Sequence, residues 1–258
     1  MAASTVDRRV LAGLRFLDRT TGGVILSPLQ LSADNTDFIR NISNIFVISR
    51  APGLEAHTRE FSQVPSTPAL ESIDINVSII DPSGRYHPRL VSVQLPRDAD
   101  PANSANANSL FQTIDIQLYP TVITKIQANW SVVRGSIIDV SETEPEPVIG
   151  ALIRIVREAD DEVLASGITD ERGEVVAIVP GVPITQFSDG EDAEDDEEDE
   201  DPVVVSELAV RLELSIDPAA AWPANPDTLE ANHAANVETT RPLSLRAGRE
   251  ERVTIELA

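Results

Sequence analysis

Three histidines and no cysteine limit the chemistry that this chain could perform. The stretch His57-Thr-Arg-Glu60 has the H-x-x-E spacing with which two side chains can bind one zinc ion. The third ligand would be a histidine, either His87 or His233, and both are distant from His57 in the sequence. We interpret the spacing as a coincidence in a solvated loop, and we expect neither a metal nor another cofactor.

Other catalytic patterns do not occur in the sequence. It contains no G-x-S-x-G elbow, no P-loop and no Rossmann glycine pattern. The lack of cysteine removes disulfides, thiolate metal sites and cysteine nucleophiles. Acidic pairs are common, but nothing indicates the pocket that a glycosidase would need. We therefore predict a protein that is not an enzyme, with no catalytic, cofactor-binding or metal-binding residue and no small-molecule substrate. Partner-binding residues stay unassigned.

The charge of the chain excludes two classes of partner. Its 43 acidic and 20 basic side chains give a formal net charge of −23. Nucleic acids and anionic membranes both attract basic surfaces, so neither is an expected partner. Eleven of the acidic residues lie between Asp189 and Asp201. This run lacks the glycine position and final spacing of an EF-hand, and we predict a disordered, solvated insertion. The alternative is a contact for a basic partner surface, or weak cation binding.

Two features of the sequence bear on localisation and on the core. No apolar run is long enough for a transmembrane helix, and the first residues lack the order of a secretory signal. We expect a cytoplasmic protein, or one assembled into a particle that is released without a signal peptide. Aromatic residues make up only 4% of the chain, so the core must be aliphatic. Trp130 and Trp222 are expected to pack in the core or at an interface.

The elements that must carry any site are strands. Between Trp130 and Gly181, short runs rich in Val and Ile end at Asp, Gly or Pro, which is typical of consecutive antiparallel strands. Asp170-Glu-Arg-Gly173 is predicted to be a turn with Gly173 at positive φ. Ile153 and Ile155 should share one face of their strand. Similar alternating runs fill residues 9–126 and 203–216, residues 54–68 and 217–236 read as loops, and no long helix is predicted.

The central stretch resembles a known family. The resemblance is carried by Val133-x-Gly135, Pro147-Val148-x-Gly150-Ala151, Thr169-Asp170-x-x-Gly173 and Pro180-Gly181. These residues are similar to the carboxypeptidase regulatory-like domain, and the resemblance implies a small transthyretin-like β-sandwich. The match departs after Pro180-Gly181, where the acidic insertion replaces the family's aromatic strand. The family is a structural module found beside many activities, so it implies fold and not function.

A weak internal repeat predicts that the whole chain is a tandem of related domains. Leu14-Arg-Phe-Leu-Asp18 parallels Gly135-Ser-Ile-Ile-Asp139, and the run that ends at Pro52-Gly53 parallels the run that ends at Pro180-Gly181. The predicted class is all-β, with two tandem Ig- or transthyretin-like antiparallel β-sandwich domains. The N-terminal domain is assigned residues 1–127. The regulatory-like domain is assigned residues 128–258, with the acidic insertion at residues 189–201.

This layout also resembles accessory structural proteins of contractile phage tails and contractile injection systems. The resemblance rests on an N-terminal sandwich that holds Arg50-Ala-Pro-Gly-Leu54 and Gly84-Arg-Tyr-His-Pro-Arg89, followed by the regulatory-like module. It implies a non-enzymatic structural or adaptor component of a phage-tail-like particle, at a baseplate, collar or cap, whose partners are other protein subunits. The alternatives are a carbohydrate- or protein-binding adhesion module and, third, an accessory chain of a zinc metallopeptidase.

Overall fold

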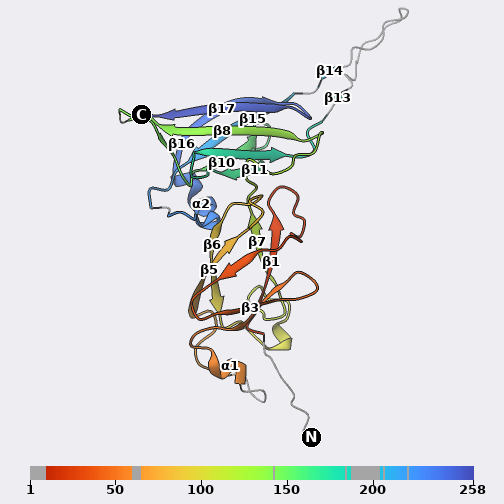
Figure 1. Ribbon diagram of the computed structural model, residues 1–258. Coiled ribbons are helices and arrows are strands. Elements are labelled where there is room, and N and C mark those ends of the chain that lie inside the picture. The colour runs from red at the N-terminus through yellow and green to blue at the C-terminus, as the bar shows by residue number, and fades with distance from the viewer. Residues whose placement is uncertain are drawn as a thin grey trace, which may run out of the picture. The chain divides into compact units, whose positions relative to one another are not determined.

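The computed structural model describes residues 10–59, 65–141, 143–183, 185–186, 204–205, 207–219 and 221–258. Strands dominate these residues, and the two α-helices are short, α1 (Glu55–Arg59) and α2 (Pro226–Asn232) (Figure 1). The predicted all-β class is therefore confirmed. Neither helix has the length or the apolar character to span a bilayer. The acidic run at residues 189–201 lies outside the described residues.

The chain divides into two compact units. Unit 1 contains Met1–Tyr119 and also Ala221–Asp227, a short segment that comes from much later in the sequence. Unit 2 contains Pro120–Ala220 and Thr228–Ala258. Residues 120–127, which the sequence places in the first domain, belong to unit 2. Unit 1 is therefore built from two separate stretches of the chain.

Unit 1 is a β-sandwich. One sheet has the strand order β3-β4-β1-β7 and the other has the order β2-β5-β6. Aliphatic side chains from both sheets, together with Phe16 and Phe46, form one core. The strands are β1 (Ala12–Asp18), β2 (Gln30–Ser32), β3 (Asp37–Arg40), β4 (Phe46–Arg50), β5 (Ile73–Ile80), β6 (Arg89–Leu95) and β7 (Ile114–Leu118), with a 3₁₀ turn at Pro101–Asn103.

Unit 2 is also a β-sandwich. Its sheets have the orders β11-β10-β15-β16 and β12-β8-β17, with β9 paired to one end of β8. Val and Ile side chains of both sheets meet in a second core. The strands are β8 (Ser131–Asp139), β9 (Glu146–Pro147), β10 (Leu152–Arg157), β11 (Val163–Ile168), β12 (Glu174–Val179), β13 (Thr185–Gln186), β14 (Val204–Val205), β15 (Leu208–Ser215), β16 (Val237–Leu245) and β17 (Glu250–Leu257); β13 pairs with β14, and a 3₁₀ turn spans His233–Ala235.

The same strand pairing occurs in both units. In unit 1 the first strand, β1, lies between β4, which is antiparallel to it, and the last strand, β7, which is parallel to it. In unit 2 the first strand, β8, lies between antiparallel β12 and the parallel last strand, β17. The opposite sheets correspond too, because β2-β5-β6 and β10-β15-β16 are both antiparallel. The expected antiparallel sandwiches thus each contain one parallel pair, which the sequence did not predict.

Individual residues of the predicted repeat hold the same places in both units. The carboxylate of Asp18 accepts the backbone N–H of Thr20 at 2.8 Å, and that of Asp139 accepts the N–H of Ser141 at 2.8 Å. Each aspartate ends the first strand of its unit, and its side chain fixes the turn that follows. The Pro-Gly pairs likewise follow β4 and β12, the antiparallel neighbours of the first strands. The sequence repeat therefore corresponds to a repeated order and pairing of strands in the two units.

The two units differ in one strand. β3 follows β2 in the chain but pairs with β4, in the sheet of the first strand. The corresponding strand of unit 2, β11, pairs with β10 in the opposite sheet. The strand before the Pro-Gly-terminated strand therefore belongs to one sheet in unit 1 and to the opposite sheet in unit 2, while the other strand pairings correspond.

The turn at Asp170–Gly173 has the predicted conformation, but it does not connect two neighbouring strands of one sheet. Gly173 has φ +72°, and the carboxylate of Asp170 accepts the N–H groups of Arg172 and Glu174. The flanking strands, β11 and β12, lie in different sheets, so this turn connects the two layers of the sandwich. Ile153 and Ile155 are fully buried in the core, as expected from the alternation along β10.

Two regions that the sequence presents as loops contain helix and buried side chains. Helix α1 lies inside the predicted polar loop at residues 54–68. Residues 217–236, predicted as a surface excursion with a turn of helix near Ala219–Ala221, contain α2 at Pro226–Asn232. Leu229 and His233 are 4% and 3% exposed, so this region is not a surface excursion. Its Pro, Ala and Asn content gave no indication that Leu229 and His233 would be buried.

Candidate functional site

The residues that the sequence singles out for chemistry are only partly described by the structure. His57 lies on α1 and is 7% exposed, so the expectation of a solvated loop was wrong. Glu60, the other half of the H-x-x-E spacing, lies outside the described residues. Among the residues that the structure describes, no cluster of three His, Asp or Glu side chains could hold a metal ion. His87 contacts the ring of Trp222, with 6.1 Å between ring centroids, and Trp130 packs against apolar residues of unit 2.

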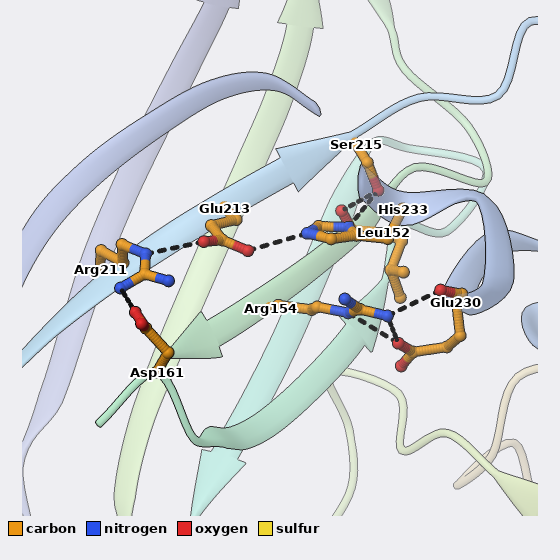
Figure 2. A network of polar contacts seen from close by, with 8 residues as sticks. All are labelled: Leu152, Arg154, Asp161, Arg211, Glu213, Ser215, Glu230 and His233. Carbon is orange, nitrogen blue, oxygen red and sulfur yellow. Dashed lines mark hydrogen bonds and ion pairs between the residues drawn. The ribbon is translucent and has the colours of Figure 1, made fainter. Parts of the chain in front are cut away.

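A polar network that the sequence analysis missed lies in unit 2, on the sheet that contains β10 and β15 (Figure 2). Glu213 and Ser215 are two residues apart on β15, so both side chains point to the same face of the sheet. His233, from the 3₁₀ turn after α2, lies between them. Its Nδ1 is 2.8 Å from Ser215 Oγ, and its Nε2 is 2.9 Å from Glu213 Oε2.

The network continues along the strand through an arginine. Arg211 Nε donates to Glu213 Oε1 at 2.7 Å, and Arg211 Nη1 donates to Asp161 Oδ1 at 2.7 Å. These hydrogen bonds raise the pKa of Arg211. Burial by itself would raise the pKa of Glu213, but the hydrogen bonds from His233 and Arg211 hold that pKa below its ordinary value. Glu213 is therefore a carboxylate whose charge is well compensated.

A second ion pair attaches α2 to the same sheet. Arg154 lies on β10, on the face opposite Ile153 and Ile155. Its Nε donates to Glu230 Oε2 at 2.7 Å, and its Nη2 donates to the backbone carbonyl of Glu230 at 2.8 Å. The side chains of this pair are about a fifth exposed. Glu230 on α2 and the following His233 are thus both fixed to the outer face of the sheet.

Serine, histidine and a carboxylate in contact are the components of a hydrolase triad, but this geometry does not support that chemistry. In a triad, histidine Nε2 contacts the serine and Nδ1 contacts the acid. Here the two ring nitrogens have the reverse partners. Ser215 and His233 are each only 3% exposed, so a substrate cannot reach the hydroxyl. The arrangement is suited to satisfying buried polar groups and holding the chain in place.

A second candidate is an open hollow of about 570 Å³ on the outer face of the β12-β8-β17 sheet. Arg134 lies in it, with Nε donating to Glu250 Oε2 at 2.9 Å and Nη1 donating to the carbonyl of Val122 at 2.8 Å. Hydrogen bonds from Arg134 and Arg252 lower the pKa of Glu250. The other lining residues are Gly135, Ser136, Glu174, Val175, Val253 and Thr254. Charges of both signs line this hollow, which suits a polar or zwitterionic surface more than an apolar ligand.

Sequence periodicity could have indicated part of these sites. The alternation along β15 places Glu213 and Ser215 on the face opposite Leu212 and Leu214, which marks two polar residues on one side of a core strand. No local signal connects them with His233, because the connection depends on how residues 217–236 fold back. The alternation along β8 similarly places Arg134 and Ser136 on the outer face.

Comparisons with known proteins do not assign the chain to a family. No protein-family model matches it, and no curated protein matches it. Among solved structures it is similar to the minor pilin GBS52 of Streptococcus agalactiae, at 10% identity and a TM-score of 0.29, over 95% of this chain and 94% of the pilin. It is also similar to the Bacillus anthracis TIE protein, at 11% identity and a TM-score of 0.26, over 96% of this chain. The chain spans about a third (34%) of that TIE structure. Likeness at this level carries no argument about activity or partners.

Proposed function

We propose that this chain is a non-enzymatic structural or adaptor subunit of a larger protein assembly. The observation that supports the proposal is the structural role of the polar network around His233. Ser215 and His233 are buried, Glu213 is partly buried, and their contacts connect secondary-structure elements, so this triad-like set of side chains serves the fold. The two β-sandwiches provide broad faces for protein partners.

The assembly that the sequence suggests is a contractile phage-tail-like particle, with this chain at a baseplate, collar or cap. The proposal includes a relationship between unit 2 and the carboxypeptidase regulatory-like domain, which rests on the matching residues near Gly135, Gly150 and Gly173. It also includes a cytoplasmic location until the particle forms. Other protein subunits are the proposed partners, without nucleic acid, membrane insertion or a small-molecule substrate.

Isolation of particles tests this function. The chain, carrying a small affinity tag, is expressed in its native host, and tail-like particles are purified by sedimentation. We expect the chain to sediment with sheath and tube subunits at a fixed ratio. A chain that stays entirely in the unsedimented fraction, while intact particles sediment, would contradict the proposal.

A binding module for carbohydrate or protein is the second candidate, and the hollow around Arg134 favours it. Binding of the purified chain to a glycan array, lost on Arg134→Ala with an unchanged circular dichroism spectrum, would support this alternative. A zinc metallopeptidase accessory chain is third. Stoichiometric bound zinc and peptidase turnover, both lost on His57→Ala in a folded protein, would support it over the structural role.

A further inference from the structure

The outer edge of β17 is the open strand edge best formed for pairing with another strand. The pairings of the edge strands β3, β11 and β16 with their neighbours are each interrupted by an irregularity, and β16 also contains Pro242. β17 instead pairs with β8 along all eight of its residues without interruption. It contains neither proline nor a bulge, which are two of the devices with which natural edge strands are blunted. Among the described residues, β17 is the longest edge strand with this property.

The backbone groups that face outward on β17 can be identified. The carbonyls of Arg249 and Leu257 accept from Val132 and Val140, so the odd-numbered residues turn their backbone groups toward β8. In a regular strand the even-numbered residues then turn theirs away. These residues are Glu250, Arg252, Thr254 and Glu256, whose side chains are exposed.

An arginine marks this edge in both units. In unit 1, Arg89 on β6 donates Nη1 to the outward carbonyl of Gln117 on the last strand. In unit 2, Arg241 on β16 donates Nη1 to the outward carbonyl of Thr254 at 2.9 Å. Because β6 corresponds to β16 and β7 to β17, both arginines reach the outer edge of the last strand from corresponding strands, although the carbonyls that they contact are not at equivalent positions. The side of unit 1 that is formed by β6 and β7 can therefore be compared with the side of unit 2 that is formed by β16 and β17.

In unit 1 that side is covered by the segment at residues 221–227. Leu90 N–H donates to the carbonyl of Ala224 at 3.1 Å, and Arg89 Nη2 donates to Asp227 at 2.6 Å. Arg89 is consequently only 1% exposed. In unit 2 Arg241 is exposed, and no strand of the described residues pairs with the outer edge of β17. The equivalent side is closed in one unit and open in the other.

We propose that β17 pairs antiparallel with β17 of a second copy of the chain, across a two-fold axis at Thr254. In this register Arg252 lies opposite the partner subunit's Glu256, and Glu256 lies opposite the partner subunit's Arg252. Thr254 lies opposite its own equivalent. Opposite charges and Thr–Thr pairs are both favourable neighbours across strands. Each opposed pair also exchanges both of its backbone hydrogen bonds.

The charges select this register over its neighbours. A shift that centres the axis on Val253 places Glu250 opposite the partner subunit's Glu256, a repulsive pair. A further shift places Arg252 opposite the partner subunit's Arg252, which is also repulsive. The contact from Arg241 does not prevent pairing, because the carbonyl oxygen of Thr254 has two lone pairs and accepts two donors. The two β12-β8-β17 sheets would then form one continuous sheet through the dimer.

This self-association goes beyond the proposed function and can be tested separately from it. The full chain is studied by sedimentation equilibrium over a range of concentrations, at about 150 mM salt so that the net charge of each copy is screened. We expect an equilibrium between a 27.9 kDa monomer and a dimer. The arrangement is two-fold symmetric, so no larger species should form through this edge.

Three variants locate the interface. Arg252→Glu places like charges opposite each other twice, so the dimer dissociation constant should rise about tenfold or more. The double variant Arg252→Glu/Glu256→Arg exchanges the charges and should restore wild-type association. Thr254→Pro removes an outward N–H without removing a hydrogen bond to β8, and it should abolish the dimer. Circular dichroism and melting temperature verify that each variant is folded.

Either of two results would overturn the proposal. The first is a wild-type chain that remains monomeric up to about millimolar concentration. The second is a dimer whose dissociation constant is unchanged by both Arg252→Glu and Thr254→Pro, since it would form through another surface. A double variant that associates no better than Arg252→Glu would contradict the specific register. None of these results depends on whether the chain belongs to a phage-tail-like particle.

Discussion

A Cβ atom on Gly173 would lie 2.4 Å from the carbonyl oxygen of Ile137, which leaves no room for any side chain at this position. Ile137 lies on β8, and Gly173 ends the turn that connects the two sheets of unit 2. The amide of Ile137 in turn donates to the carbonyl of Gly173 at 2.9 Å. The turn and the central strand are thus fitted to each other at the backbone level.

Gly173→Ala is therefore expected to destabilise the protein by about 2–4 kcal/mol, since the strain of positive φ adds to a backbone clash. Gly181→Ala is the matched control, because Gly181 also has positive φ (+76°) but its Cβ would meet no atom within 4 Å. That variant should cost about 1–2 kcal/mol. Urea unfolding of both proteins measures the difference, and equal losses would show that the contact with Ile137 is unimportant.

Ile155→Ala should destabilise the protein by about 2–5 kcal/mol, because Ile155 is fully buried and the substitution leaves a cavity in the core of unit 2. Ile149→Ala provides the comparison, since Ile149 is 45% exposed and should change the free energy of unfolding by less than about 1 kcal/mol. Similar losses for the two variants, measured by denaturant unfolding, would mean that β10 does not face the core as described.

The paired arginines allow a comparison between the units. Arg89→Met should destabilise the protein by about 2–3 kcal/mol, because buried charged hydrogen bonds to Gln117 and Asp227 are lost. Arg241→Met, at an exposed position on the corresponding strand of unit 2, should cost less than about 0.5 kcal/mol in the monomer. The measurement is thermal or urea unfolding at low protein concentration. A larger loss for Arg241→Met would contradict the assignment of the open and closed sides.

The partly buried carboxylate of Glu213 in the polar network predicts a dependence of stability on pH. The pKa of Glu213 is lower in the folded protein than its ordinary value of 4.5, so the folded state binds fewer protons than the unfolded state. Its contribution to stability is complete above that ordinary value and is lost as pH falls through the folded pKa. The stability difference between wild type and Glu213→Gln should therefore narrow as the pH falls below about 4.5. A difference that stays constant over this range would contradict the role of the Glu213 charge.

Local signals were sufficient for the strands and for part of the topology. Asp18 and Asp139 were matched from sequence, and both end the first strand of a unit and cap the following turn. The conformation of Gly173 was also predictable, because the surrounding turn chemistry is local. The parallel pairing of first and last strands could not be predicted, since it joins residues at opposite ends of each unit and leaves no local pattern.

Regions with little periodicity were the main source of error. Residues 217–236 contain prolines and small polar residues typical of an exposed loop, yet His233 and Leu229 are buried there. His233 contacts Ser215 and Glu213 on the outer face of a sheet that is formed by residues elsewhere in the sequence. For the same reason the Ser215–His233–Glu213 contacts were not anticipated. The predicted behaviour of the acidic run at 189–201 remains a prediction, because that run lies outside the described residues.

The two-part composition of unit 1 has a consequence for how the protein is made. A ribosome releases Tyr119 long before it releases residues 221–227, so the first sandwich emerges while Arg89 still lacks Asp227 and Leu90 still lacks Ala224. β8 likewise waits for β17, which comes last among the strands of unit 2. Unit 1 is therefore complete only after residues 221–227 have been synthesised, and unit 2 only after β17, and until then the nascent chain exposes strand edges that chaperones would have to protect.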